Sequence, residues 1–266
     1  MLSRLSRPRA LALSALPIAA LFAVVGLAPL PYAVAQPGST ADVLGVDKGR
    51  EVISIAGAPV RKTEGQLRMT TIVATGPSVD VGLGEVVDAW FRTDRAVMPI
   101  HSVYPPGKSD AEIEKHNLGQ MKESQDAATL AALHYLKKDP AKVRVTLHLA
   151  DIGGPSAGLL FSLGIVDKLD GAPAGKAGDL TGGRIVAGTG TIGADGKVGA
   201  VGGVSLKTQA AARDGATVFV VPKDECAEAK AELPEGMRLI PVTALDDAVS
   251  SLRALAQGEE ARVPSC

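Results

Sequence analysis

The 266-residue sequence has few aromatic residues, few cysteines and almost no net charge. Only 3% of its residues are Phe, Trp or Tyr, whereas glycine occurs 30 times, so we expect a core of small and aliphatic side chains with close backbone packing. A formal net charge of −1 argues against nucleic-acid binding, and we expect no such partner. The apolar fraction of 46% is typical of a globular protein with a sizeable core, arranged as one large or two small domains.

The sequence also lacks a nucleotide-binding loop and a recognisable metal site. Residues 171–177 contain glycines and a lysine, but without the spacing between the glycines or the Ser/Thr after the lysine that a phosphate loop requires. The two cysteines have no histidine and no second cysteine pair near them, which excludes a zinc site. We therefore expect no cofactor, no metal and no ATP hydrolysis by this chain.

The first 36 residues differ from the rest. Three arginines, Arg4, Arg7 and Arg9, precede an uncharged run over residues 10–30. Ala33-Val34-Ala35 then has the small-x-small form of a signal-peptide cleavage site, although the run is also long enough to span a bilayer. Residues 1–36 are interpreted either as a cleaved signal peptide or as a membrane anchor. In both cases the remaining chain is exported, and it is either secreted or held on the extracytoplasmic side of the cell membrane.

Export would place the two cysteines in a compartment where disulfides form. Cys226 and Cys266 make an even number in an oxidising compartment, and Cys266 is the last residue. A disulfide between them would hold a chain end that otherwise frays.

The pattern of the rest predicts alternating strands and helices. Residues 37–48 are interpreted as a linker, residues 49–256 as one domain with parts at 49–140 and 141–256, and residues 257–266 as a polar tail. Strands are expected at residues 51–56, 66–74, 143–149, 185–187, 217–221 and 239–242. Helices are expected around residues 86–91, 109–136, 156–168, 204–213 and 244–255. Trp90, the sole tryptophan, is expected in the core.

Ser156 is the first candidate for a catalytic residue. It follows a glycine turn and Pro155, so it is expected in the first turn of a helix, where free N–H groups can hold an oxyanion. The simpler alternative is a helix-capping serine. The Gly154-x-Ser156-x-Gly158 spacing also fits the nucleophile elbow of α/β-hydrolases, but all four histidines precede Ser156, the wrong order for that fold. A nucleophilic Ser156 would then need another base, such as an uncharged lysine.

Lys207 is the lysine that fits this role. Val204, Lys207 and Ala211 fall on one face of a predicted helix, so the lysine shares the apolar face. Burial would remove its proton by desolvation. The alternative is an ammonium that reaches out to the rim of the core.

Three motifs in order resemble the proteolytic domain of Lon-type serine proteases: Gly154-Pro-Ser-Ala-Gly158, Thr189-Gly-Thr191, and Gly202-Gly-Val-x-x-Lys207. Upstream segments such as Ser124-Gln-Asp126 are similar to a narrower, membrane-anchored or exported group that acts without ATP. The resemblance implies an α/β (α+β) fold like the second domain of ribosomal protein S5. It also implies polypeptide substrates, Ser156 as nucleophile, Lys207 as base and Thr189 as the partner that orients the lysine.

Two features depart from the family. The PDZ domain usual in that group has no room, because only residues 138–142 separate the long helix from the strand before the serine. Gly153 stands where many Lon proteases have an aspartate. Gly153 and Gly154 would let the backbone approach an oxyanion closely, and Asp151 could replace the missing carboxylate only if the turn brings it round.

Other functions are also compatible with the sequence. An inactive exported binding or scaffold protein of the same fold is the main alternative. Small-molecule kinases share the general fold family and place a phosphate loop at a helix start, but export to a compartment poor in ATP argues against them. A homo-oligomer is compatible with either function.

Overall fold

The computed structural model describes residues 7–104, 107–149, 155–170 and 178–266. The chain forms two compact units. Unit 1 comprises residues 1–35 and 74–107, and unit 2 comprises residues 36–73 and 108–266. Strands β1 (Tyr32–Asp42) and β5 (Gln66–Ala74) cross from one unit to the other.

Unit 1 contains an apolar helix and a small pair of strands. Its elements are α1 (Arg7–Leu27), the start of β1, α2 (Leu83–Trp90), β6 (Ala96–Pro99) and α3 (Ile100–Val103). Tyr32–Ala35 of β1 pairs antiparallel with β6, and Ala33 and Ala35 are buried. Among the helices that the structure describes, none combines the length and the apolar character needed to cross a membrane.

Unit 2 is built on a sheet with strand order β12-β11-β8-β5-β1. The strands that follow β5 are β8 (Ile185–Gly188), β11 (Val218–Pro222) and β12 (Arg238–Val242). The four strands from β5 to β12 pair in parallel. Their connections therefore cross over the faces of the sheet and place helices there.

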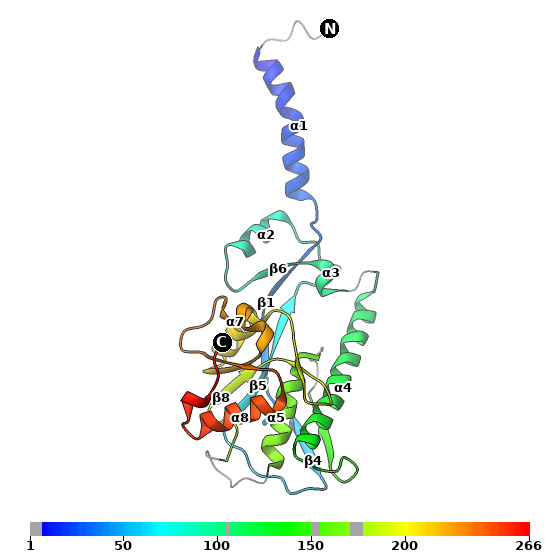
Figure 1. Ribbon diagram of the computed structural model, residues 1–266. Coiled ribbons are helices and arrows are strands. Elements are labelled where there is room, and N and C mark those ends of the chain that lie inside the picture. Colours follow the sequence, from blue (N-terminus) through cyan, green and yellow to red (C-terminus); the bar gives the residue numbers. More distant parts are fainter. Residues whose placement is uncertain (1–6, 105–106, 150–154, 171–177) are drawn as a thin grey trace. The chain divides into compact units, whose positions relative to one another are not determined.

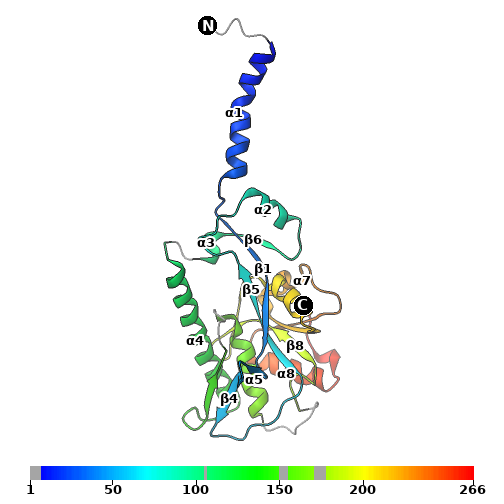
Figure 2. The ribbon, with the colours of Figure 1, turned by 180° about the vertical axis from the view of Figure 1, so that it is seen from behind.

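Both faces of this sheet are covered by helices (Figures 1 and 2). The first face carries α4 (Asp110–Tyr135), α5 (Gly158–Leu169) and α8 (Leu245–Ala256), and the second carries α6 (Val204–Arg213) and α7 (Cys226–Lys230). In β11, Val218 and Val220 pack on the first face, while Phe219 and Val221 pack on the second. This explains why the strand is apolar throughout, as the sequence predicted.

Shorter elements complete unit 2. They are the hairpin β2 (Val46–Asp47) and β3 (Arg50–Glu51), the antiparallel pair β4 (Ile53–Ala56) and β7 (Arg144–Leu147), the antiparallel pair β9 (Thr191–Ile192) and β10 (Val198–Gly199), and the 3₁₀ turns η1 (Pro155–Ala157), η2 (Lys223–Glu225) and η3 (Glu260–Arg262). The mixed α/β fold expected from the sequence is confirmed. So is the capping box of α4, in which the Ser109 and Glu112 side chains bond each other's backbone N–H.

The predicted linker at residues 37–48 is wrong. Residues 37–42 continue β1 in the sheet, and Val46–Asp47 is β2. Gly38 in β1 has a packing reason, because a Cβ there would lie 2.3 Å from Thr71 Oγ1 of the neighbouring strand β5. The small, polar composition of this stretch therefore reflects close strand packing rather than a flexible connection.

The expected core position of Trp90 is also wrong. The α2 helix forms as predicted, but its Trp90 side chain is 79% exposed. Residues 257–266, predicted as a polar tail, are attached to unit 2, because Val263 is buried and Cys266 is bonded to Cys226. The predicted disulfide is thus confirmed, with the two Cα atoms 5.5 Å apart.

Candidate active site

Ser156 lies in the turn η1, immediately before α5. Ser124 of α4 holds this turn by donating a hydrogen bond to the Pro155 carbonyl at 2.9 Å. The approach of α4 also explains Gly158, because a Cβ there would lie 2.8 Å from Ser124 Oγ. The Gly-Pro-Ser-Ala-Gly stretch is therefore fixed against α4, with Ser156 itself only partly buried.

Thr189 connects the serine turn to the sheet. It follows directly after β8, and its backbone N–H donates to the Val220 carbonyl of β11 at 3.1 Å. Its hydroxyl donates to the Ser156 carbonyl at 3.3 Å, and the Gly190 N–H donates to the same oxygen at 2.9 Å. The backbone of Ser156 is thus held at the carboxyl end of a parallel strand, the usual place for sites in such sheets.

Lys207 reaches the same point from the other face of the sheet. It lies on α6, whose N-cap Gly203 has a φ of 68°, a conformation that favours glycine. The Lys207 residue is 3% exposed, and its Nζ donates a hydrogen bond to Thr189 Oγ1 at 3.2 Å. The sequence prediction that this lysine shares the apolar face is confirmed, and the alternative in which its ammonium reaches solvent is not what the structure has.

Burial changes the ionisation of this amine. Desolvation lowers the pKa of Lys207 from its ordinary 10.5 to about 8, although the negative charges of Glu228 and Glu225 act in the opposite direction. Glu228 also accepts a hydrogen bond from the Val204 N–H at 2.7 Å, at the start of α6. Burial and the neighbouring Glu228 in turn raise the pKa of Glu225. The lysine therefore lies in a mostly apolar place with a carboxylate pair nearby.

The described contacts between Lys207 and Ser156 pass through Thr189. Lys207 donates a hydrogen bond to the Thr189 hydroxyl, and this hydroxyl donates a hydrogen bond to the Ser156 carbonyl. An uncharged amine that uses one N–H in this way keeps its lone pair free to accept a proton. With a pKa of about 8, roughly a tenth of the molecules carry an uncharged amine at pH 7.

Several residues considered from the sequence lie elsewhere. Gly153, Gly154 and Asp151 fall outside the described residues, so the oxyanion-binding backbone expected there stays a prediction. Lys168 is buried, but its Nζ donates to Glu51 at 3.1 Å and to the Ile53 carbonyl at 2.9 Å. Within the described ranges, no group of three or more His, Cys, Asp or Glu side chains could hold a metal ion.

Two residues near the site were not assigned a role from the sequence. Ser124 lies in a segment that carries the family resemblance, but nothing local shows that its hydroxyl reaches Pro155, 31 positions later. Glu228 lies among alternating Ala, Glu and Lys residues, typical of an exposed helix face. Only the fold brings it to the start of α6.

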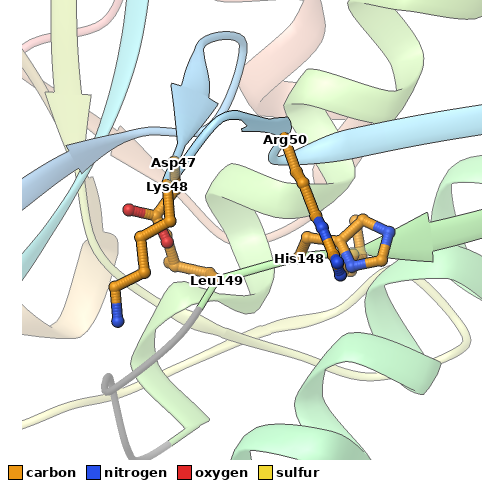
Figure 3. A pocket seen from close by; sticks show the side chains of 6 residues that line it. Asp47, Lys48, Arg50, His148 and Leu149 are labelled. Carbon is orange, nitrogen blue, oxygen red and sulfur yellow. The ribbon is translucent and has the colours of Figure 1, made fainter.

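A cavity of about 500 Å³ lies at the end of β7, the strand that leads to Ser156. Asp47, Lys48 and Arg50 from the β2–β3 hairpin line one part of it, and residues 147–149 line the other. Figure 3 shows the Arg50 side chain extending toward His148, which belongs to the second group. The strand expected over residues 143–149 ends at Leu147, so His148 lines the cavity just beyond it.

Comparison with known proteins identifies a family. A family model of the Lon protease (S16) C-terminal proteolytic domain matches residues 55–254. Among curated proteins, the Lon protease of Chloroflexus aggregans is 27% identical over 186 residues, or 63% of this chain and 21% of that protein. The Lon protease of Azospirillum brasilense is 31% identical over 172 residues, or 60% of this chain and 20% of that protein. The chain thus spans about a fifth of the length of these relatives.

The matched region contains Ser156, Thr189 and Lys207, together with the parallel strands β5, β8, β11 and β12. It begins within β4 and ends within α8, and so includes most of unit 2. Both the fold and the family expected from the three motifs are confirmed. The chain belongs to the Lon protease (S16) C-terminal proteolytic domain family, a family of serine protease domains.

Proposed function

We propose that this chain is a serine endopeptidase that uses Ser156 as nucleophile and Lys207 as general base, and that it cleaves exported or unfolded polypeptides without ATP. One observation carries this proposal. A lysine that is almost fully buried is hydrogen-bonded to Thr189, which in turn bonds the backbone of the candidate nucleophile. Burying an amine lowers the free energy of unfolding, so a buried lysine next to the candidate nucleophile favours a chemical role over a structural one.

The proposed reaction needs only groups of this chain and water. Uncharged Lys207 accepts the Ser156 hydroxyl proton while Oγ attacks the peptide carbonyl carbon. Backbone N–H groups at or near Gly154 and Ser156 hold the oxyanion. The protonated Lys207 then gives its proton to the leaving amine, which leaves an acyl-enzyme. Water hydrolyses this ester with Lys207 acting again as base.

The cavity at the end of β7 is the place where we expect a substrate side chain to bind. Its lining residue Leu149 lies seven positions before Ser156 in the chain. Arg50 and Lys48 bring two positive charges to the cavity and Asp47 brings one negative charge, so polar side chains suit it.

Action outside the cytoplasm is supported by the disulfide between Cys226 and Cys266, because such bonds persist in oxidising compartments. Independence from ATP is supported by the sequence, in which no segment has the spacing of a nucleotide-binding loop. The main alternative is an inactive binding or scaffold protein of this family. The unusual environment of Lys207 favours the enzyme.

The test is cleavage of an unstructured protein by the full chain without ATP. We expect cleavage by the wild type, and a loss of at least about a thousandfold in Ser156→Ala and in Lys207→Arg, since arginine does not give up its proton. A serine-directed acylating probe should label the wild type but not Ser156→Ala. Equal cleavage by the wild type and Ser156→Ala would show that the activity comes from elsewhere. An unlabelled, inactive wild type would favour the scaffold.

A further inference from the structure

The end of α2 exposes an aromatic surface that the proteolytic site does not use. Trp90 is 79% exposed and Phe91 is 84% exposed. Val87 is also exposed, and its spacing of three and four residues from the two aromatics places all three on one face of the helix end. We call this surface the Trp90 patch (Val87, Trp90 and Phe91). Large aromatic side chains are seldom so exposed, and neighbouring ones indicate a binding surface.

The same unit contains a second exposed apolar surface, on α1. From Leu11 to Leu27 the described side chains of this helix are almost all apolar, and they are exposed. A helix that is apolar all round is suited to an apolar surrounding rather than to water.

The two surfaces meet at a short junction. Shortly after α1 ends, the Leu30 N–H donates a hydrogen bond to the Val81 carbonyl at 2.9 Å. Val81 lies two residues before the start of α2. An apolar medium that surrounds the end of α1 would therefore be met by the neighbouring α2.

Four charged side chains near the patch form two ion pairs within unit 1. Arg92 pairs with Asp94, and Arg95 pairs with Asp88, at 2.8 and 2.9 Å. These two pairs carry no net charge, and the remaining acid of α2, Glu85, accepts a hydrogen bond in the N-terminal cap of the helix, at the end remote from the patch. A tryptophan beside neutral, apolar groups is typical of the boundary between water and lipid, where the ring is buried and its N–H stays hydrated.

We propose that the Trp90 patch docks on the interfacial region of a phospholipid bilayer, next to the place where α1 contacts the lipid. This inference concerns lipid contact and does not require α1 to cross the bilayer. It is independent of the proposed peptidase activity. Because the neighbouring ion pairs are neutral overall, apolar contact should dominate, and anionic lipids should add little.

The single tryptophan makes a direct experiment possible, since all tryptophan fluorescence of the full chain comes from Trp90. The full chain is incorporated into phosphatidylcholine vesicles at a low ratio of protein to lipid. We expect protection from acrylamide, and quenching by lipids brominated near the headgroup that exceeds quenching by lipids brominated at the chain ends. Full acrylamide access without quenching by either lipid overturns the proposal. Protection that appears only at high protein density also overturns it, because it indicates a second copy as the occupant.

Two matched variants keep the fluorophore. Phe91→Ser removes one of the two aromatic side chains and should reduce the quenching by brominated lipid about threefold or more, because less apolar area is buried. Leu118→Ser changes a side chain of α4 that is 51% exposed and should leave the quenching unchanged. If the two variants give the same quenching, the patch does not contact lipid.

Discussion

At the scale of the residue, Lys207 links catalysis to stability. Its amine is almost fully buried, and it has one hydrogen-bond partner, Thr189, among the contacts that the structure describes. The charged form is therefore disfavoured in the folded chain, which lowers the pKa to about 8. The same burial makes an uncharged base available, and it lowers the free energy of unfolding whenever the amine is protonated.

Replacing Lys207 by methionine should stabilise the protein at neutral pH. The folded pKa of about 8 is below the ordinary 10.5, so the unfolded chain binds more protons between these values, and wild-type stability rises with pH in that window. Below pH 8 the full cost, about 3 kcal/mol, is present. Lys207→Met should remove it at pH 7, and the gain should shrink as pH approaches 10.5. Chemical denaturation at several pH values measures this difference. A destabilised variant with no pH dependence would show that the lysine is not buried as a charge.

Replacing Glu228 by glutamine should move the pH dependence of cleavage. The negative charge of Glu228 raises the pKa of Lys207, so its removal lowers that pKa and makes the uncharged base available at lower pH. Glutamine can still accept the hydrogen bond from Val204. We expect cleavage at pH 7 to rise roughly twofold to tenfold, with the rising limb of the pH–rate profile shifted to lower pH.

Glu225→Gln is the control for this effect. Glu225 acts on Lys207 in the same direction as Glu228, but less strongly. Its shift should have the same sign and be smaller. A profile that does not move in either variant would mean that Lys207 does not set the pH dependence.

The sequence predicted those parts of the site that local patterns determine. Lys207 could be placed because helical spacing alone puts it on an apolar face. The role of Glu228 could not be predicted, because its contact with Val204 depends on α7 packing against α6. The same holds for Ser124, whose partner is in another element.

At the scale of the element, strong local signals gave the correct structure. The strand β5 is rich in β-branched residues, and α4 begins with a capping box, so both were predicted close to their observed bounds. The continuation of β1 over residues 37–42 was missed because its Pro, Gly and Ser are typical of loops. Pairing within the sheet overrides that preference. Trp90 was predicted in the core because tryptophan is usually buried. That tendency does not distinguish a core position from an exposed position that contacts another surface.

The disulfide fixes the helix that carries Glu228. Cys226 begins α7, and its partner Cys266 lies 40 positions later at the chain end. Cys266→Ser should lower the free energy of unfolding by about 4 kcal/mol in the loop-entropy estimate for this separation. Denaturation under oxidising conditions measures it, and the wild type treated with reductant should match the variant. Equal stability of the oxidised wild type and the variant would contradict a stabilising role.

At the scale of the whole molecule, the N-terminal segment is part of the fold. The family match begins at residue 55, so α1 and β1 precede the region shared with Lon proteases. Yet Tyr32–Ala35 pairs with β6, and both alanines of the expected cleavage motif are buried. Cleavage after Ala35 would remove residues 32–35 of this pair and leave the backbone edge of β6 without its partner strand.

We therefore expect residues 1–36 to act as an anchor that stays attached, rather than as a cleaved signal peptide. Intact mass measurement of the protein from its native membrane fraction should give the full chain, allowing for removal of the first methionine. A mature N-terminus at Gln36 would show instead that the strand pair is lost on export. A chain that starts at Gln36 should have weaker hydrogen-exchange protection over β6, because residues 96–99 lose their backbone partners. Protection in β11, which lies between β8 and β12 in the sheet, should not change.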